Sequence, residues 1–216
     1  MNSMELARFN MVEQQVRPWD VLDARVLDLM KKVKRELFVP AEHQALAFMD
    51  MEIPLGHGVS MWQPKLEARA LQELNLRGGD SVLEVGTGSG YLTAMLARLV
   101  KHVTSVEIVS ELAASAAEKL AACKLANVSL HTGDAAQGWA GEYDAIILTG
   151  SVPVLPEAFL ESLKIGGRLF AIVGDAPVMD ARRITCVAPG TFETVSLFET
   201  NVAPLQNAIQ PSRFTF

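Results

Sequence analysis

Apolar and polar positions along the first third of the chain follow a helical period. Residues 20–34 predict an amphipathic helix, which Asp20 would cap, and residues 64–76 predict a second helix with Pro64 in its first turn. The apolar stripe of the first helix consists of Leu22, Val26, Leu29, Met30 and Val33. Residues 36–58 mix short apolar pieces with two prolines and predict a wrapping segment without regular elements.

From Ser81 onward the pattern changes to buried strands that alternate with helices. Strands are predicted at 81–86, 102–108, 128–134, 143–150 and 167–174, and helices after the first strand, at 111–124 with Ser110 as its cap, and at 155–164. This alternation predicts a doubly wound α/β fold with a parallel sheet. Residues 181–188 and 191–202 read as two consecutive strands, so we expect seven strands, mostly parallel, ending in an antiparallel hairpin, with an N-terminal helical extension.

Composition and charge narrow the class of protein. Half of the 216 residues are apolar and a fifth are charged, which is typical of a globular protein with a substantial core. The net charge of −6 offers no basic field for nucleic acid or an anionic membrane, so neither is expected as a partner. The one basic cluster, KKVKRE at 31–36, is assigned to the exposed side and end of the first predicted helix.

The cysteines and histidines do not form a recognisable ligand set. Cys123 and Cys186 have no histidine nearby in the sequence and are expected to be free thiols that fill the core of a cytoplasmic protein. No secretory segment or long apolar run is visible at the N-terminus. The four histidines lack the spacing of metal ligands, and no metal site is expected.

The stretch LEVGTGSGY carries the main chemical signal. Gly86, Gly88 and Gly90, separated by Thr87 and Ser89, follow the first predicted strand, where the chain must turn sharply into a helix. Glycine lets the backbone approach a ligand closely, and a helix N-terminus offers free N–H groups. The spacing differs from the G-x-G-x-x-G of a dinucleotide site.

Acidic residues mark the ends of three successive strands. Glu84 precedes the glycines, Glu107 and Ile108 end the second strand, and Gly133, Asp134 and Ala135 end the third. Glu84 would suit an ammonium group rather than a phosphate, Glu107 the two ribose hydroxyls, and Asp134 an adenine amino group. This ordered set predicts an S-adenosylmethionine site. Each element alone also has a structural explanation: a turn, a helix cap or, for Asp134, a turn residue.

With these residues in view, the chain resembles the protein-L-isoaspartate O-methyltransferase family. The resemblance runs from about Met11 to the fifth predicted strand and includes RVLDLMKKVKRELFVP, MEIPLGHGVS, VLEVGTGSGYLTAMLA, GDAAQGWAGEYDAIIL and LKIGGRLFAIVG. It implies a Rossmann-like methyltransferase that methylates the α-carboxylate of isoaspartyl residues in damaged proteins. It also implies that residues 1–78 form the helical extension and a covering loop, and 79–216 the cofactor-binding part of one compact unit.

The covering loop, GHGVSMWQP, departs from the family pattern Gly-x-Gly-Gln-Thr-Ile-Ser-x-Pro. Val59 stands at the glutamine, Ser60 at the threonine, and Trp62 at the family's active-site serine. An indole N–H still donates, but its bulk would fill part of the site, and Ser60 could supply the lost hydroxyl. Ser60 and Trp62 are therefore the candidate catalytic positions, and His57 is interpreted as a loop or packing residue.

Three functions remain open on the sequence alone. The chain could act on isoaspartyl proteins or peptides, transfer methyl groups to a small-molecule acceptor, or serve as an impaired cofactor-binding interaction module. A dehydrogenase is disfavoured by the glycine spacing. Two further segments depart from the family pattern: TGSVPVLP, at 149–156, and the C-terminal part, which matches only loosely. The departures therefore concern the part of the site that would bind the methyl acceptor, whereas the cofactor motifs are intact. The aromatic tail with Phe214 and Phe216 could dock or fray, and a monomer or weak homodimer is expected.

Overall fold

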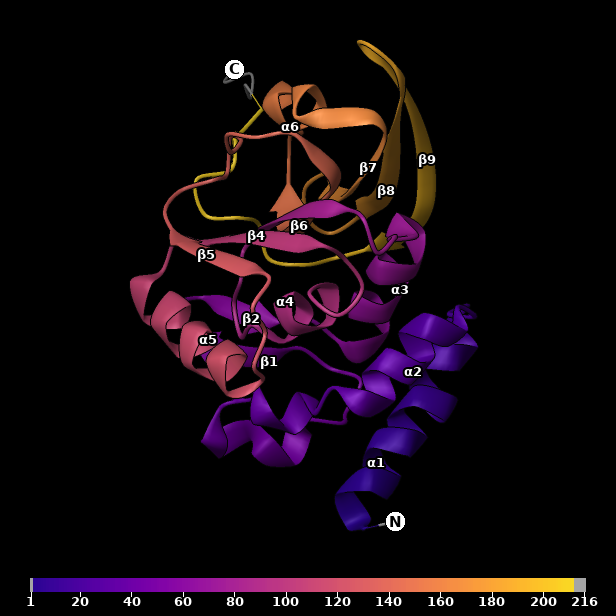
Figure 1. The fold of residues 1–216 in the computed structure, drawn as a ribbon, viewed down its shortest axis with the longest axis vertical. Helices are drawn as coiled ribbons and strands as arrows, with labels where there is room; N and C mark the ends of the chain where they lie inside the picture. Colours follow the sequence, from indigo (N-terminus) through magenta and orange to yellow (C-terminus); the bar gives the residue numbers. More distant parts are fainter. Residues whose placement is uncertain (1, 212–216) are drawn as a thin grey trace.

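A seven-stranded sheet forms the centre of the molecule (Figure 1). The computed structural model describes residues 2–211, so the predicted docking of Phe214 and Phe216 lies outside the described residues. The strands are β3 (Ser81–Val85), β4 (His102–Glu107), β5 (Val128–Thr132), β6 (Tyr143–Val152), β7 (Leu163–Val173), β8 (Met179–Ala188) and β9 (Thr191–Thr200), in the spatial order β5-β4-β3-β6-β7-β8-β9.

The strand directions confirm the predicted fold class. β5, β4, β3, β6 and β7 pair in parallel, and β8 and β9 add to β7 as an antiparallel hairpin. The chain leaves β3 toward β4 and later returns to the other side of β3 with β6. The order of the strands therefore reverses at β3, and such a point is where open α/β sheets usually bind ligands.

Helices cover both faces of the sheet (Figure 1). They are α3 (Pro64–Leu74), α4 (Tyr91–Leu96), α5 (Ser110–Ala122) and α6 (Glu157–Glu161). In this view α3, α4 and α5 lie on one side, and α6 lies on the other beside β7. The helix predicted with Pro64 in its first turn is confirmed as α3. Ser110 does not cap α5: the helix already includes it, and its hydroxyl donates to the neighbouring Glu111 carboxylate.

The N-terminal region is less regular than the periodicity predicted. It contains α1 (Ser3–Met11), a π-helical stretch Val12–Val16, the 3₁₀ turns Arg17–Trp19, Arg35–Leu37 and Ala41–Leu46, and α2 (Ala24–Lys32). The cap of α2 is Asp23, whose side chain accepts from the Arg25 N–H, rather than Asp20. Asp20 instead ends the preceding turn at φ 59°, and Leu22, which precedes the helix, is 72% exposed.

The basic cluster at 31–36 is only partly a solvated helix end. Lys31 and Lys32 form the last turn of α2, as expected. Arg35 is fully buried, however, and forms an ion pair with the buried Glu67 of α3. Sequence periodicity did not reveal this because the partner lies 32 residues further along the chain.

One hydrophobic core joins the N-terminal region to the sheet. A single cluster of buried side chains includes Met11, Met30 and Phe38 from the extension together with Val82 and Ile147 from the strands. A short hairpin, β1 (Ile53–Gly56) and β2 (Val59–Met61), connects the two regions. The proposed boundary between residues 78 and 79 therefore does not separate two cores.

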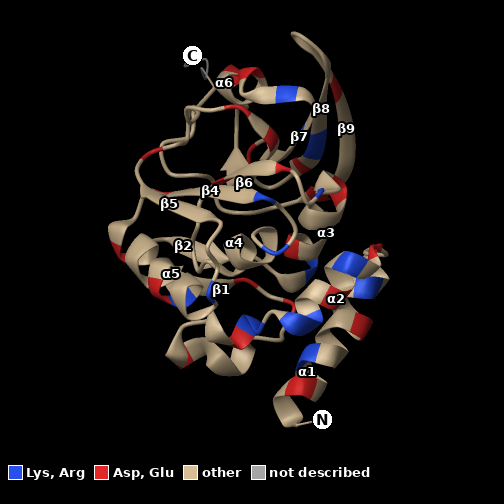
Figure 2. Cartoon of the chain, in the orientation of Figure 1, with Lys and Arg blue, Asp and Glu red and all other residues tan. Residues whose placement is uncertain are grey.

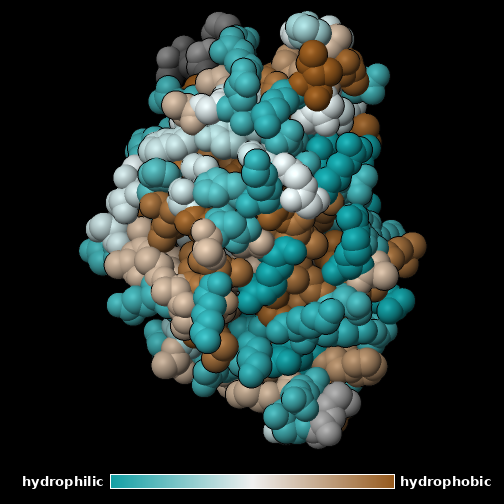
Figure 3. Space-filling model, in the orientation of Figure 1, coloured by the Kyte–Doolittle hydropathy of each residue, from teal (hydrophilic) through white to brown (hydrophobic). Residues whose placement is uncertain are grey.

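Charged side chains are concentrated on the outer helices, and α1 and α2 carry many of both signs (Figure 2). On the face shown in Figure 3, polar side chains surround smaller areas where apolar atoms reach the surface. No helix within residues 2–211 combines the length and apolarity needed to cross a bilayer. Cys186 is buried and Cys123 half-buried, and both are free thiols.

Candidate active site

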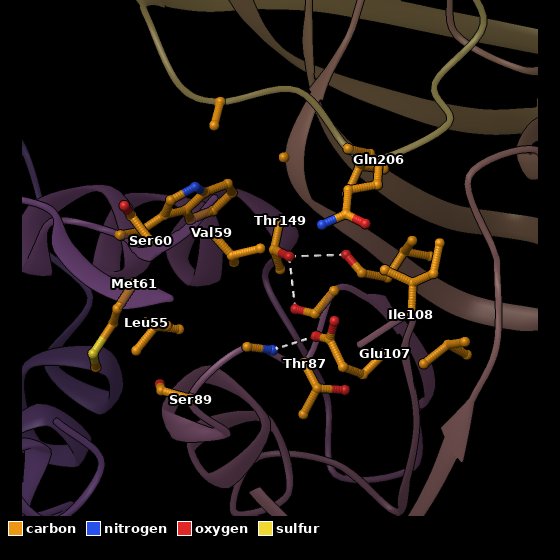
Figure 4. Close-up of a pocket in the computed structure, with 18 of the residues that line it drawn as sticks. Leu55, Val59, Ser60, Met61, Thr87, Ser89, Glu107, Ile108, Thr149 and Gln206 are labelled. Atoms are coloured by element: carbon orange, nitrogen blue, oxygen red, sulfur yellow. Dashed lines mark hydrogen bonds between the residues drawn. The ribbon is translucent and has the colours of Figure 1, made fainter. Parts of the chain in front are cut away.

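A cavity lies at the carboxyl ends of the central parallel strands. The turns that follow β3, β4 and β5 form its floor, and Thr149 and Gly150 of β6 complete that side. The β1–β2 hairpin and the C-terminal segment 203–206 cover it from the opposite side. In the close-up, Val59 and Ser60 lie across the cavity from Glu107 and Ile108 (Figure 4).

The glycine turn after β3 excludes a residue with a Cβ atom at Gly86. Gly86 has φ +94°, and a Cβ atom there would lie 2.2 Å from Thr149 Oγ1. That hydroxyl is within hydrogen-bond distance of the carbonyl oxygens of Val85 (2.9 Å) and Gly86 (2.6 Å) (Figure 4). Only glycine fits this arrangement without strain, because the conformation is left-handed and the space is occupied.

Glu107 is held rigidly at the end of β4. Its Oε2 accepts from the Gly88 N–H at 2.7 Å (Figure 4), and its Oε1 accepts from the Val109 N–H at 3.0 Å. The side chain is nearly buried yet lines the cavity. Each carboxylate oxygen has a second lone-pair direction, so Glu107 can still accept hydrogen bonds from a ligand.

The turn after β5 brings Gly133, Asp134 and Ala135 to the cavity, as the sequence predicted. The Asp134 carboxylate accepts from the Ala136 N–H at 2.9 Å and from Asn207 Nδ2 at 2.8 Å. Asp134 therefore stabilises its own turn and ties it to the C-terminal segment. Its structural role and a ligand-binding role are compatible, because a carboxylate has four acceptor positions.

Glu84 does not line the cavity, although the sequence placed it beside the ligand. Side chains alternate between the two faces of a strand, and Glu84 points toward α4. There its Oε2 accepts from Thr93 Oγ1 at 2.5 Å and from Ser105 Oγ at 2.6 Å. Its Oε1 has no partner within the described chain, and burial raises the pKa of Glu84 to about 7.

Ser60 and Trp62 both line the opposite side of the cavity. Ser60 belongs to β2 and is half-buried, so its hydroxyl lies on the side of the cavity opposite the turns that follow β3, β4 and β5. The Trp62 indole is 6% exposed and packs edge-on against Phe170, with ring centroids 6.4 Å apart. Its backbone carbonyl accepts from Arg35 Nη2 at 2.6 Å, which anchors the loop to the N-terminal region.

Sequence reasoning missed the C-terminal segment that covers the cavity. Ser151 pairs with Pro204, and the Leu205 N–H donates to the Ser151 carbonyl at 2.9 Å. Gln206 Nε2 contacts the His57 carbonyl at 3.4 Å and so joins this segment to the β1–β2 hairpin. His57 itself takes a left-handed conformation at φ 54°, consistent with a loop role. No local sequence signal predicts such pairing between distant segments.

The cavity is lined by acidic side chains, of which Glu67 is paired with Arg35 and has its pKa raised by burial to about 8. Its lining includes the carboxylates of Glu52, Glu67, Glu107 and Asp134 and no lysine, arginine or histidine of the described chain. The lining therefore disfavours a phosphate and suits a cationic ligand. Within the same residues, no group of histidines, cysteines and acids is arranged to hold a metal ion.

These features define the class of protein: a Rossmann-like methyltransferase fold with its ligand cavity at the strand switch point. The chain belongs to the protein-L-isoaspartate(D-aspartate) O-methyltransferase (PCMT) family, whose model matches residues 8–207.

Individual relatives agree with this assignment over nearly the whole chain. A protein-L-isoaspartate O-methyltransferase from Rhodopseudomonas palustris is 40% identical over 201 residues, which is 92% of each chain. Its counterpart from Methanoculleus marisnigri is 38% identical over 92% of this chain and 90% of its own. A Plasmodium falciparum structure with the same PCMT designation, in complex with S-adenosyl-L-homocysteine, has a TM-score of 0.80 at 23% identity, covering 92% of this chain and 98% of its own. The last comparison supports the fold.

Proposed function

We propose that the protein is an S-adenosylmethionine-dependent methyltransferase that esterifies the α-carboxylate of isoaspartyl residues in damaged proteins. The ester then closes to a succinimide that can reopen as normal aspartate, so the reaction repairs the backbone. The observation that carries the proposal is the cavity at the strand switch point, where the glycine turn and Glu107 face the covering loop. Family membership over residues 8–207 supports it.

The residues of the cavity fit this cofactor. Gly86 and Gly88 line the cavity, so a ligand can lie against their backbone, and the acidic lining suits a sulfonium cation with an ammonium group. Glu107 is proposed to accept from the ribose hydroxyls, and Ile108, Asp134 and Ala135 to hold the adenine. Bound S-adenosylmethionine supplies an activated methyl group on sulfur.

Catalysis requires little from the protein beyond alignment of the two reactants and exclusion of water. An acceptor carboxylate is ionised at neutral pH and is already a nucleophile, so no catalytic base is required. Holding two reactants in line can lower a barrier by about 7–11 kcal/mol in well-aligned cases. The covering hairpin and segment 203–206 restrict access of water, and Ser60 is proposed to donate to the acceptor carboxylate in place of the family's serine.

A different acceptor is the second candidate, and Trp62 is the observation that favours it. An indole occupies the position of the family's serine and lines the cavity, and its bulk takes up space that an extended peptide would need. A small or aromatic carboxylate could then be the substrate. A non-catalytic binding module is less consistent with the structure, because Glu107 and the glycine turn retain an ordered arrangement around an open cavity.

The proposal is tested by methyl transfer from labelled S-adenosylmethionine to an isoaspartyl peptide and to its aspartyl isomer, beside calorimetric binding of the cofactor. We expect transfer to the isoaspartyl peptide alone. Cofactor binding without transfer would favour the second candidate, and no cofactor binding would contradict the methyltransferase proposal itself.

We further propose that the protein acts in the cytoplasm as a monomer or weak homodimer.

A further inference from the structure

Within residues 2–211, Glu52 is the one cavity carboxylate whose side chain has no hydrogen-bond or ion-pair partner. Glu67 is paired with Arg35, Glu107 accepts two backbone N–H groups, and Asp134 accepts from Ala136 and Asn207. Glu52 also lines the cavity, yet it makes no hydrogen bond or ion pair with any residue between 2 and 211. Its charge is therefore available to a ligand.

Glu52 lies on the side of the cavity formed by the β1–β2 hairpin, where the methyl acceptor is proposed to bind. It immediately precedes β1, where Ile53 pairs with Met61 of β2 in an antiparallel register. Extending that register by one residue brings Glu52 opposite Trp62, the position of the family's serine. Both residues line the cavity, whereas the residues proposed to hold the cofactor lie on the turns after β3, β4 and β5.

The surroundings of Glu52 do not neutralise it. Lys65 of α3 is the lysine nearest to Glu52 in the sequence, and it forms an ion pair with Asp50 at 2.7 Å. Glu52 is half-buried, and burial raises its pKa because the charged form is poorly solvated. An acceptor carboxylate bound nearby would add a second negative charge, so a cation brought by the substrate would relieve both.

We propose that Glu52 forms a subsite for a lysine or arginine side chain adjacent to the isoaspartyl residue of the substrate, and so determines which damaged sequences are methylated. This inference rests on the proposed function. Because the interaction is electrostatic and made equally in the ground and transition states, it changes KM more than kcat. It also weakens as the ionic strength rises.

The test uses three isoaspartyl peptides that differ at one flanking position: lysine, acetyl-lysine of nearly the same shape, and glutamate. The series is made once with this residue before the isoaspartyl group and once after it. We expect the wild-type protein to prefer the lysine peptide about threefold over the acetyl-lysine peptide in kcat/KM, with the difference in KM. The glutamate peptide is expected to be the poorest substrate.

Glu52→Gln is expected to abolish the preference for the lysine peptide over the acetyl-lysine peptide. Glu42→Gln, which removes the same charge from an exposed position outside the cavity, is the matched control and should keep the preference. Unchanged binding of S-adenosyl-L-homocysteine and an unchanged unfolding midpoint would show that Glu52→Gln is folded.

Equal rates with all three peptides, or a preference that survives in Glu52→Gln, would overturn the inference and leave the proposed function intact. Transfer to none of the peptides, with the cofactor bound, would overturn the proposed function and this inference with it.

Discussion

At the scale of single residues, the two sides of the cavity differ in how tightly their groups are held. Glu107 has both carboxylate oxygens fixed by backbone N–H groups of the turns that follow β3 and β4. Among the described residues, none donates such a hydrogen bond to the Glu52 carboxylate, and Ser60 presents a hydroxyl from a short strand. The cofactor side is therefore preorganised, whereas the acceptor side retains groups that a substrate can engage.

Glu107→Gln should weaken cofactor binding by tenfold or more. The amide keeps one acceptor but places an NH₂ group against a backbone N–H, and a lost hydrogen bond of a charged group costs about 1.5–3 kcal/mol. Calorimetric titration with S-adenosyl-L-homocysteine measures the effect, with the exposed Glu118→Gln as the control. An affinity equal to that of the control would show that Glu107 does not hold the ligand.

Glu84 should make the protein less stable as the pH rises from about 4.5 to about 7. Burial raises the pKa of Glu84 to about 7, so in this range the folded protein retains a proton that the unfolded chain releases. The free energy of unfolding therefore falls with increasing pH, by roughly 3 kcal/mol over the whole range.

Glu84→Gln removes this contribution, because a neutral amide can still accept from the hydroxyls of Thr93 and Ser105. Urea unfolding at about pH 5 and about pH 8 should show a smaller loss of stability in the variant than in the wild type. An equal loss in both proteins would contradict the assigned pKa shift. Glu118→Gln again provides the control.

At the scale of elements, the turn between β3 and α4 couples the sheet to the cavity. Gly86→Ala should abolish cofactor binding, because the new Cβ would displace Thr149 Oγ1 and the residue would be strained at φ +94°. Gly78→Ala, at a position with open space and no positive φ, is the matched control and should bind normally. Calorimetry compares the two, and normal binding by Gly86→Ala would contradict the proposed role of this turn.

The sequence predicted the elements of the sheet better than those of the N-terminal region. β3, β6 and β7 contain apolar runs that are buried in the sheet, and glycine turns follow β3 and β7, so these strands could be placed from local pattern. The 3₁₀ and π-helical turns before α2 have no such period, and the choice between Asp20 and Asp23 as its cap depends on backbone conformation.

The same distinction holds for the candidate site. Strand ends in a parallel sheet meet at one edge, so the cofactor side, including Glu107 and Asp134, could be assembled from the sequence. The direction of the Glu84 side chain, the contact between Thr149 and Gly86, and the cover formed by 203–206 depend on packing between distant segments. These features could not be predicted from local sequence.

At the scale of the whole molecule, the extension and the sheet are expected to fold as one unit. Their side chains share one core, and polar contacts reinforce it: Arg168 Nε donates to the Leu74 carbonyl at 2.8 Å, and Lys119 Nζ to the Phe38 carbonyl at 3.0 Å. The full chain should therefore unfold in a single transition.

A fragment of residues 79–216 should fail to fold cooperatively, because removing the extension exposes the apolar side chains that it covers. Circular dichroism during heating compares the fragment with the full chain. A cooperative transition in the fragment, together with binding of S-adenosyl-L-homocysteine, would show that 79–216 is an independent domain.

Repair of an isoaspartyl peptide is the most direct test of the proposed activity. An isoaspartyl peptide is incubated with the protein and S-adenosylmethionine, and its conversion to the aspartyl isomer is followed by chromatography against a reaction without the cofactor. We expect the isoaspartyl form to be progressively replaced by the aspartyl form only when protein and cofactor are both present. An isoaspartyl peptide that persists at the level of the control, despite measured cofactor binding, would contradict the claim that this site repairs isoaspartyl residues with Trp62 in place of the family's serine.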